Sequence, residues 1–198
     1  MYQHSIFDDP EPLADPDFKA ITRIPLGRLA WVDYLPNWVA GHDALFRDLS
    51  DRIDWHHHRR QMYERVVDVP RLTGSVPKPG RHQSGFVLSL GRMLSARYRR
   101  PLPSLSYAYY RDGQDSVAMH GDKVGNRLDD CVVAIVAVGE PRRFLLREVD
   151  GDGAQTFEVG WGDLLVMGGN AQRTWQHGIP KAVSRGPRIS IMFRQGMA

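Results

Sequence analysis

The chain has 198 residues, a net charge of +3 at pH 7 and a hydrophobic fraction of 42%. These values are typical of one soluble globular domain with a sizeable core, and they permit a polyanionic partner without requiring one. The longest apolar run, residues 131–138, is too short to span a membrane, and the acidic start of the chain lacks the features of a signal peptide. Cys131 is the single cysteine, which predicts a small core side chain and a cytoplasmic protein without disulfides. We expect a monomer that makes no membrane contact.

The N-terminal third of the chain predicts an arm, a strand and a helix. Residues 1–25 are rich in proline and aspartate and predict a loosely held N-terminal arm. Weak alternation over 26–35 predicts a strand. Residues 37–54 predict a helix that Asn37 caps, with Trp38, Leu45 and Leu49 on one face. The three consecutive histidines 56–58 cannot chelate a metal from one face, and we expect them in an exposed loop.

A second strand and a second helix follow. Alternation over 62–69 predicts the strand, and a loop rich in proline and glycine extends to residue 80. Residues 83–98 predict the helix, because Phe86, Leu90 and Leu94 recur at helical spacing. We expect the two helices to cover one sheet of the C-terminal half.

From residue 104 the pattern changes to short strands separated by turn residues. The predicted strands cover residues 104–111, 116–122, 131–138, 142–147, 156–159, 163–167, 173–177 and 188–194. This pattern predicts a mostly β protein with flanking helices and a double-stranded β-helix, or jelly-roll, core. The expected organisation is a single domain over 26–198, with its jelly-roll core over 104–195.

A candidate metal site lies within these strands. His120 and Asp122 are two residues apart in an extended segment, so their side chains point to the same face. His177 can complete the set once the sheet folds. Two imidazoles and one carboxylate on one face of a metal leave three positions open, which is the arrangement of non-haem Fe(II) oxygenases.

The last predicted strand carries a candidate anion site. Arg188, Ser190, Met192 and Arg194 share one face of it. Arginines that face a barrel interior are costly unless they pair with anions, and a guanidinium binds a carboxylate with two hydrogen bonds. A dicarboxylate is therefore a natural partner, and the alternative is an edge strand whose arginines are solvated.

Four sequence blocks in a fixed order resemble the AlkB family of Fe(II)/2-oxoglutarate dioxygenases over residues 60–195. The blocks are residues 110–122, which contain the HxD; residues 141–144 (PRRF); residues 162–169 (GDLLVMGG) followed by Gln172, Trp175, His177 and Pro180; and residues 188–194 (RISIMFR). The Pro70-Arg71-Leu72 tripeptide is similar to an element that precedes the substrate lid in that family.

The resemblance implies a catalytic centre and a reaction. His120, Asp122 and His177 would bind Fe(II), and the enzyme would use O₂ and 2-oxoglutarate to oxidise an N-alkyl group on a damaged base of DNA or RNA. The hydroxylated alkyl group would then leave as an aldehyde. The residues that the resemblance assigns to 2-oxoglutarate are Tyr110, Arg188, Ser190 and Arg194.

Two departures from the family pattern affect these assignments. Ala108 and Ser190 stand where well-studied members carry asparagine, so we expect 2-oxoglutarate affinity to depend more on the arginines. Lys123 and Val124 follow the HxD, where those members carry acidic residues that recognise the base. Asp129 and Asp130 are the candidate substitutes.

The substrate lid is expected over residues 55–82. An enzyme that acts on a base must flip it or bind single strands, with basic residues on phosphates and aromatic side chains against bases. Met62 or Tyr63 would fill the gap left by a flipped base, and the alternative is a surface hairpin with a buried tyrosine. Trp161 and Trp175 are expected in the core. The candidate substrate-binding residues are Arg59, Arg60, Met62, Tyr63 and Arg71.

Three functions stay open at this point. The first is oxidative dealkylation of nucleic acid, which the basic lid favours. The second is a 2-oxoglutarate oxygenase that acts on a protein or a small molecule, which the missing acidic residues favour. The third is a catalytically silent jelly-roll binding module, against which the intact His-Asp-His set and both arginines argue.

Overall fold

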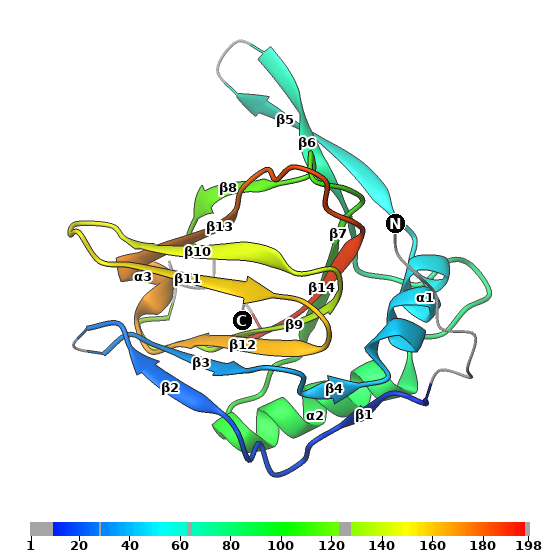
Figure 1. Ribbon diagram of the computed structural model, residues 1–198, viewed down its shortest axis with the longest axis horizontal. Coiled ribbons are helices and arrows are strands. Elements are labelled where there is room, and N and C mark those ends of the chain that lie inside the picture. Colours follow the sequence, from blue (N-terminus) through cyan, green and yellow to red (C-terminus); the bar gives the residue numbers. More distant parts are fainter. Residues whose placement is uncertain (1–9, 28, 63–64, 123–127, 197–198) are drawn as a thin grey trace.

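Two stacked antiparallel sheets form the body of the molecule (Figure 1). The computed structural model describes residues 10–27, 29–62, 65–122 and 128–196, and within 58–69 it describes only the backbone. In spatial order the eight-stranded sheet contains β2 (Thr22–Pro25), β3 (Trp31–Leu35), β12 (Asp163–Gly168), β9 (Val133–Gly139), β14 (Arg188–Arg194), β7 (Ser104–Tyr110), β6 (Arg65–Gly74) and β5 (His56–Met62). The four-stranded sheet contains β11 (Ala154–Val159), β10 (Arg142–Glu148), β13 (Trp175–Ile179) and β8 (Val117–His120). This arrangement confirms the predicted jelly roll.

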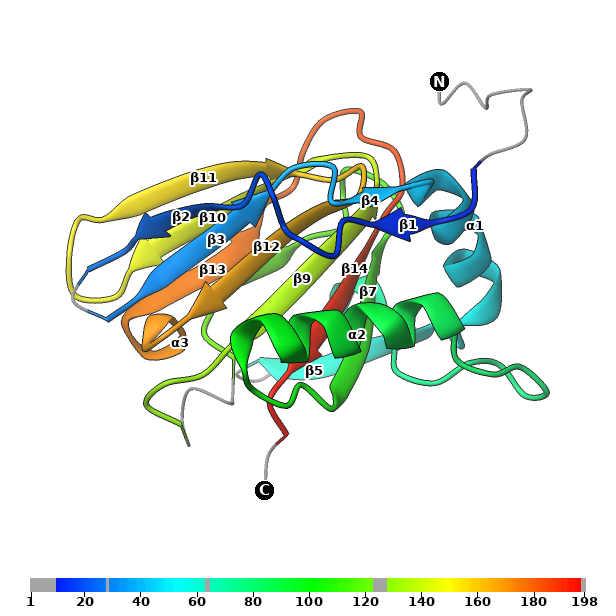
Figure 2. The same cartoon turned by 90° about the horizontal axis from the view of Figure 1, so that it is seen from below.

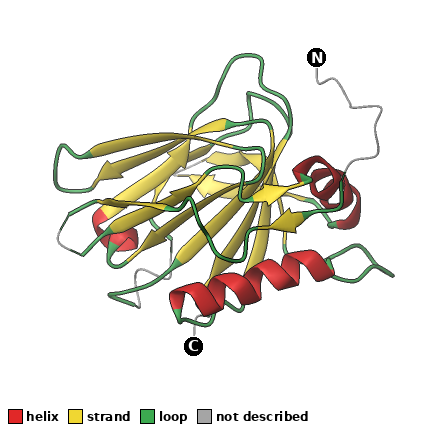
Figure 3. Ribbon diagram, turned by 60° about the horizontal axis from the view of Figure 1, so that its bottom comes forward, coloured by secondary structure: helices red, strands yellow, loops and turns green. Residues whose placement is uncertain are grey.

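Helices cover the outer face of the large sheet, as Figures 2 and 3 show. They are α1 (His42–Arg52) and α2 (Gly85–Tyr98), and a single-turn helix, α3 (Ala171–Thr174), joins β12 to β13. Leu45 and Leu49 of α1 and Leu90 of α2 pack in one buried cluster with the outward side chains of β9 and β14. A second cluster fills the space between the two sheets, and it includes Phe144. No helix among the described residues is long and apolar enough to cross a membrane.

The alternation of β14 decides what faces each cluster. Ile189, Ile191 and Phe193 are buried against the helices, as their apolar character requires. The alternate residues of the strand therefore point to the space between the sheets, and Arg188 there is fully buried. β14 covers the predicted residues without any shift, and β9 is buried along its whole length, as its apolar run predicts.

The N-terminal prediction was partly wrong. Residues 10–25 do not form a loosely held arm, because they include β1 (Leu13–Ala14), which pairs with β4 (Val39–Ala40), and the edge strand β2. Phe18 is buried and stacks on Trp38 with ring centroids 5.1 Å apart. Residues 1–9 lie outside the described part of the chain.

The start of the first helix was also predicted wrongly. Asn37 does not cap α1, because it lies in a turn with φ 51° and its N–H donates to Asp163. Gly41 precedes the helix with φ 64°, and a Cβ there would come within 2.3 Å of the Pro10 carbonyl oxygen. The close approach and the left-handed backbone both require glycine at this position.

The predicted loop of three histidines is a strand. His56, His57 and His58 begin β5, which pairs with β6 in a hairpin that projects from the body of the molecule (Figure 1). The Pro70-Arg71-Leu72 tripeptide lies within β6 rather than after the strand. β5 is the edge strand of the large sheet, which agrees with its polar sequence.

One tryptophan is core and the other is not. Trp175 is buried and donates its indole N–H to the Leu26 carbonyl oxygen, as expected for a core residue. Trp161 is 50% exposed in a turn with φ 45°, so its expected place in the core was wrong.

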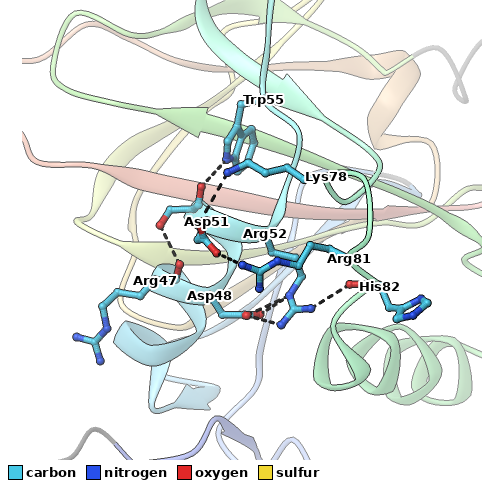
Figure 4. Close-up of polar contacts among 9 residues, drawn as sticks. Arg47, Asp48, Asp51, Arg52, Trp55, Lys78, Arg81 and His82 are labelled. Carbon is cyan, nitrogen blue, oxygen red and sulfur yellow. Dashed lines mark hydrogen bonds and ion pairs between the residues drawn. The ribbon is translucent and has the colours of Figure 1, made fainter.

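Ion pairs join the root of the hairpin to α1 (Figure 4). Arg52 donates to both carboxylate oxygens of Asp48 at 2.9 and 3.0 Å and to the His82 carbonyl oxygen at 3.1 Å. Asp51 pairs with Arg81 at 2.8 Å and with Lys78 at 3.8 Å. The chain enters β5 directly after α1 and leaves β6 into the segment that carries these partners, so the contacts fix both ends of the hairpin.

We expect Arg52→Ala to lower the free energy of unfolding by about 1 kcal/mol, because hydrogen bonds from a charged, partly exposed group contribute on that scale. Urea denaturation measures the loss. Arg92→Ala, at an exposed position of α2, is the matched control and should change stability little. Equal stabilities of the two variants would contradict a role for Arg52 in holding the hairpin root.

Candidate metal centre

The structure brings the three predicted ligands together at one end of the small sheet. His120 ends β8 and is paired in register with His177 of β13, so neighbouring strands present both imidazoles. Asp122 follows two residues after His120. The potential ligand atoms of the three side chains all lie within 4.8 Å of one another, and among the described residues this is the one such group of histidine, cysteine and acidic side chains.

Each imidazole is held in a form that suits a metal. Nδ1 of His120 lies 2.9 Å from the Ala118 carbonyl oxygen, and when it donates there, Nε2 is left free to bind. Nε2 faces Asp122, 3.9 Å from Oδ1. His177 is buried and stacks on Phe144 with ring centroids 5.5 Å apart. Burial lowers the pKa of His177 to about 3, so its ring is neutral near pH 7, as a ligand must be.

Asp122 is fixed through both its side chain and its backbone. Burial alone would raise the pKa of Asp122, but the Arg194 guanidinium outweighs it and the pKa is lowered, so the group stays a carboxylate. Nε of Arg194 donates to Oδ2 of Asp122 at 2.8 Å, and another nitrogen of Arg194 donates to Ser106. The backbone N–H of Asp122 donates to the side chain of Gln172 at 2.9 Å.

Buried polar groups that suit an anion lie between the sheets at the other end of β14. Arg188 is fully buried, and it donates to the Val159 carbonyl oxygen at 2.9 Å and to the Ser190 hydroxyl at 2.6 Å. Its guanidinium lies 5.4 Å from the ring centroid of Tyr110. Burial lowers the pKa of Arg188 to about 10, so it carries its charge at neutral pH. β14 lies inside the large sheet with Arg188 buried, so the alternative of an edge strand with solvated arginines is excluded.

A second buried arginine flanks the same tyrosine. Arg142 lies 5.8 Å from the ring centroid of Tyr110 and donates at 2.8 Å to the carbonyl oxygens of Asp112, Asp115 and Pro180. It thus joins β10 to the two loops that contain these carbonyl groups. Arg142 was not among the predicted site residues, because β10 carries three arginines and the strand's pattern does not single out the buried one.

Unsatisfied polar atoms gather around this site. Among the described residues, five buried side-chain nitrogens have no hydrogen-bond partner. Four of them belong to His177, Arg71, Arg142 and Arg188. Buried polar groups are rarely left unpaired, so a cluster of them marks a place that a ligand completes. The donor set fits a metal cation beside the imidazoles and a carboxylate anion beside Arg188.

The predicted substrate residues are described unequally. Arg71 lies on β6, and a nitrogen of its guanidinium is 3.4 Å from the Ser116 carbonyl oxygen. Arg59, Arg60 and Met62 lie on β5, where the structure describes the backbone alone. Tyr63 falls outside the described residues, as do Lys123 and Val124. The lid assignment of these residues stays a prediction.

The candidate substitutes for base recognition have other partners. Asp130 pairs with Arg100, and Asp129 pairs with Arg173. Both aspartates are exposed, and neither belongs to the group of potential metal ligands. These contacts favour a role in holding the segment after the metal ligands over a role in reading a base.

Comparisons with known proteins agree with this site. The model of the 2OG-Fe(II) oxygenase superfamily matches residues 107–194. The chain is 30% identical over 174 residues to the cattle (Bos taurus) alpha-ketoglutarate-dependent dioxygenase alkB homolog 3 and 28% identical over the same length to the human protein. Each match covers 77% of this chain and 60% of the relative, so the chain spans about three fifths of the length of these curated relatives.

Solved structures agree on the fold. A 2OG-Fe(II) oxygenase family oxidoreductase from Burkholderia pseudomallei has a TM-score of 0.57 at 14% identity, with 82% of this chain and 84% of that chain covered. A structure described as OsALKBH1 has a TM-score of 0.55 at 16% identity, with 89% of this chain and all of that chain covered. At these identities the likeness supports the fold alone.

Proposed function

We propose that this chain is a member of the AlkB family of Fe(II)/2-oxoglutarate-dependent dioxygenases and that it removes alkyl groups oxidatively from damaged bases of DNA or RNA. One observation carries the proposal: the potential ligand atoms of His120, Asp122 and His177 converge within 4.8 Å, and buried nitrogens of His177 and Arg188 have no hydrogen-bond partner. A metal and a dicarboxylate cosubstrate would complete both.

Some of these residues would bind the metal, and others would bind the cosubstrate. His120, Asp122 and His177 would hold Fe(II), which when bound supplies the oxidative chemistry with O₂ and 2-oxoglutarate. Arg188 would bind the distal carboxylate of 2-oxoglutarate with the help of Ser190, since one of its guanidinium nitrogens is buried without a partner.

Two further groups shape the cosubstrate pocket. Tyr110 is buried between Arg188 and Arg142, and burial raises the pKa of its hydroxyl, so it remains protonated and can donate to a carboxylate. Arg194, which holds Asp122, would lie near the proximal carboxylate. Ala108 lies opposite Ser190 in the β7–β14 ladder and offers no polar atom, so affinity rests on the arginines.

The edge hairpin supports a nucleic-acid substrate. β5 carries three histidines and two arginines at the open edge of the large sheet, and the β5–β6 hairpin projects from the body of the molecule (Figure 1). A basic, projecting element suits contact with phosphates next to a base that must leave its stack. Arg71 connects this hairpin to the site, because it lies close enough to His177 and Tyr110 to affect their pKa values.

The test is direct turnover. The protein is incubated with Fe(II), 2-oxoglutarate, ascorbate and a panel of alkylated DNA and RNA oligonucleotides, and products are read by mass. Loss of an alkyl mass from at least one oligonucleotide together with succinate supports the proposal. Succinate formed with a protein or small-molecule extract, but with none of the oligonucleotides, would contradict the nucleic-acid substrate and indicate a protein or small-molecule substrate.

The hairpin arginines give a separate prediction. Replacing Arg59 and Arg60 together by Ala should flatten the dependence of oligonucleotide binding on salt by a log–log slope of about 0.7 for each lost phosphate contact. Fluorescence anisotropy over a salt series measures the slope. Arg143→Ala with Arg147→Ala, two exposed positions on β10, removes the same charge and should leave the slope unchanged. If both double variants show the same slope, the hairpin arginines make no phosphate contacts and the hairpin is not part of the binding surface.

A further inference from the structure

Gln172 links the two segments that carry the metal ligands. It lies in α3, directly before β13 with its His177, and it is buried although it is polar. Its side-chain oxygen accepts the backbone N–H of Asp122 at 2.9 Å, and its side-chain nitrogen lies 3.4 Å from the sulfur of Met167. The side-chain nitrogen of Gln172 thus contacts the core at Met167, while its side-chain oxygen holds the backbone of Asp122.

The backbone of the same residue also contacts the ligand segment. A Cβ at Gly121 would come within 2.6 Å of the Gln172 carbonyl oxygen, so the segment between the two N-terminal ligands passes directly against α3. Glycine is needed for that approach. One residue therefore touches the segment of His120 and Asp122 at two points, while the chain that follows it leads to His177 within five residues.

We infer that Gln172 is a positioning residue for the metal centre, which sets the Asp122 backbone so that its carboxylate converges with the two imidazoles. Arg194 orients the carboxylate itself, but a side chain can converge only if its backbone is fixed. The N–H of Asp122 is the anchor, and Gln172 supplies its acceptor. The inference rests on the proposed metal site and adds to it a residue that binds no metal.

Co(II) binding tests the inference without turnover. Gln172→Met keeps the length and volume of the side chain and suits its contact with Met167, but it offers the Asp122 N–H no strong acceptor. We expect this variant to bind Co(II) about 10–100-fold more weakly, the scale for loss of a residue that supports a ligand. Its Co(II) absorption spectrum should also change, because Asp122 no longer holds its place.

Two variants and a control separate positioning from general damage. Gln172→Glu retains an acceptor oxygen at the same reach and should keep Co(II) affinity close to that of the wild type. Gln172→Asn remains an amide but is one methylene shorter, so it should lose affinity, and it replaces the Met variant if that one fails to fold. Gln176→Met, at an exposed position of β13, is the matched control and should bind as the wild type does.

The outcomes are distinct. Wild-type Co(II) affinity and spectrum in the Met and Asn variants, with both folded, would overturn the positioning role while the metal site stands. A wild type that binds no Co(II) would overturn the metal site and this inference with it. Weak Co(II) binding in Gln172→Met and Gln172→Asn with near wild-type binding in Gln172→Glu supports the inference. If Gln172 had a merely structural role, Co(II) affinity would not depend on whether an acceptor oxygen is present at that reach.

Discussion

Replacing His120, Asp122 or His177 singly by Ala is expected to abolish 2-oxoglutarate decarboxylation. Each change leaves two ligands on a metal that needs three, and the loss should exceed the roughly 100-fold effect known for residues that only support a ligand. Succinate formation under anaerobic loading with Fe(II) followed by exposure to air measures the effect. We therefore expect the decarboxylation activity of each variant to fall by more than about 100-fold.

The fold should survive at least two of these changes. His120 is 39% exposed and its removal opens no core cavity. Loss of the Asp122 carboxylate frees Arg194, which is 21% exposed and keeps its bond to Ser106, so its charge is not stranded. Asp129→Ala is the matched control, since it removes a nearby carboxylate that is 88% exposed and outside the ligand group. Full turnover in any ligand variant would refute the assignment of that residue.

The sequence predicts the parts of the fold that have strict periodicity. β14 alternates apolar and polar residues except at Met192, and one face meets the helices while the other faces the space between the sheets, so its boundaries and the direction of Arg188 follow from the pattern. β9 is predicted by an uninterrupted apolar run, because it is buried on both faces. The spacing of His120 and Asp122 predicts their convergence for the same geometric reason.

Local signals mislead where the backbone conformation is set by a distant contact. Asn37 is a good capping residue by type, but its N–H is taken by Asp163, which is far away in the sequence, and the helix starts after Gly41 instead. The three consecutive histidines of β5 show no alternation of apolar and polar residues, yet pairing with β6 makes them a strand. Trp161 is apolar by type but occupies a left-handed turn that faces solvent.

The residues that support the site were not predictable from spacing. Gln172 and Asp122 are fifty residues apart, and no periodic pattern relates a single-turn helix to the residue after a strand. The three carbonyl acceptors of Arg142 lie on two loops, and backbone acceptors leave no trace in the sequence. Ligands can be recognised by residue type, whereas the contacts that orient them depend on tertiary structure.

The second large effect concerns the cosubstrate. Arg188→Met removes the guanidinium and keeps an unbranched side chain of similar volume in a fully buried position. We expect 2-oxoglutarate binding to weaken by about 2–4 kcal/mol, the scale for removing one partner of a buried charge pair. Isothermal titration of the Mn(II)-loaded protein measures the affinity without turnover. Arg188→Lys should restore only part of the loss, because an ammonium cannot reproduce the two-point contact of a guanidinium with a carboxylate.

Arg188→Met should weaken 2-oxoglutarate binding but should not lower the thermal stability of the protein without 2-oxoglutarate. Arg188 is charged, fully buried and leaves one nitrogen without a partner, so its apolar replacement is expected to match or exceed the wild type in thermal stability. Arg185→Ala is the matched control, because its guanidinium is 39% exposed near Glu158 and should affect neither quantity. An Arg188→Met variant that folds and binds 2-oxoglutarate as tightly as the wild type would show that the distal carboxylate is held elsewhere. Lower affinity with undiminished stability is the combination that a charge kept for its ligand predicts, because the cost of burying it is recovered only when the anion is bound.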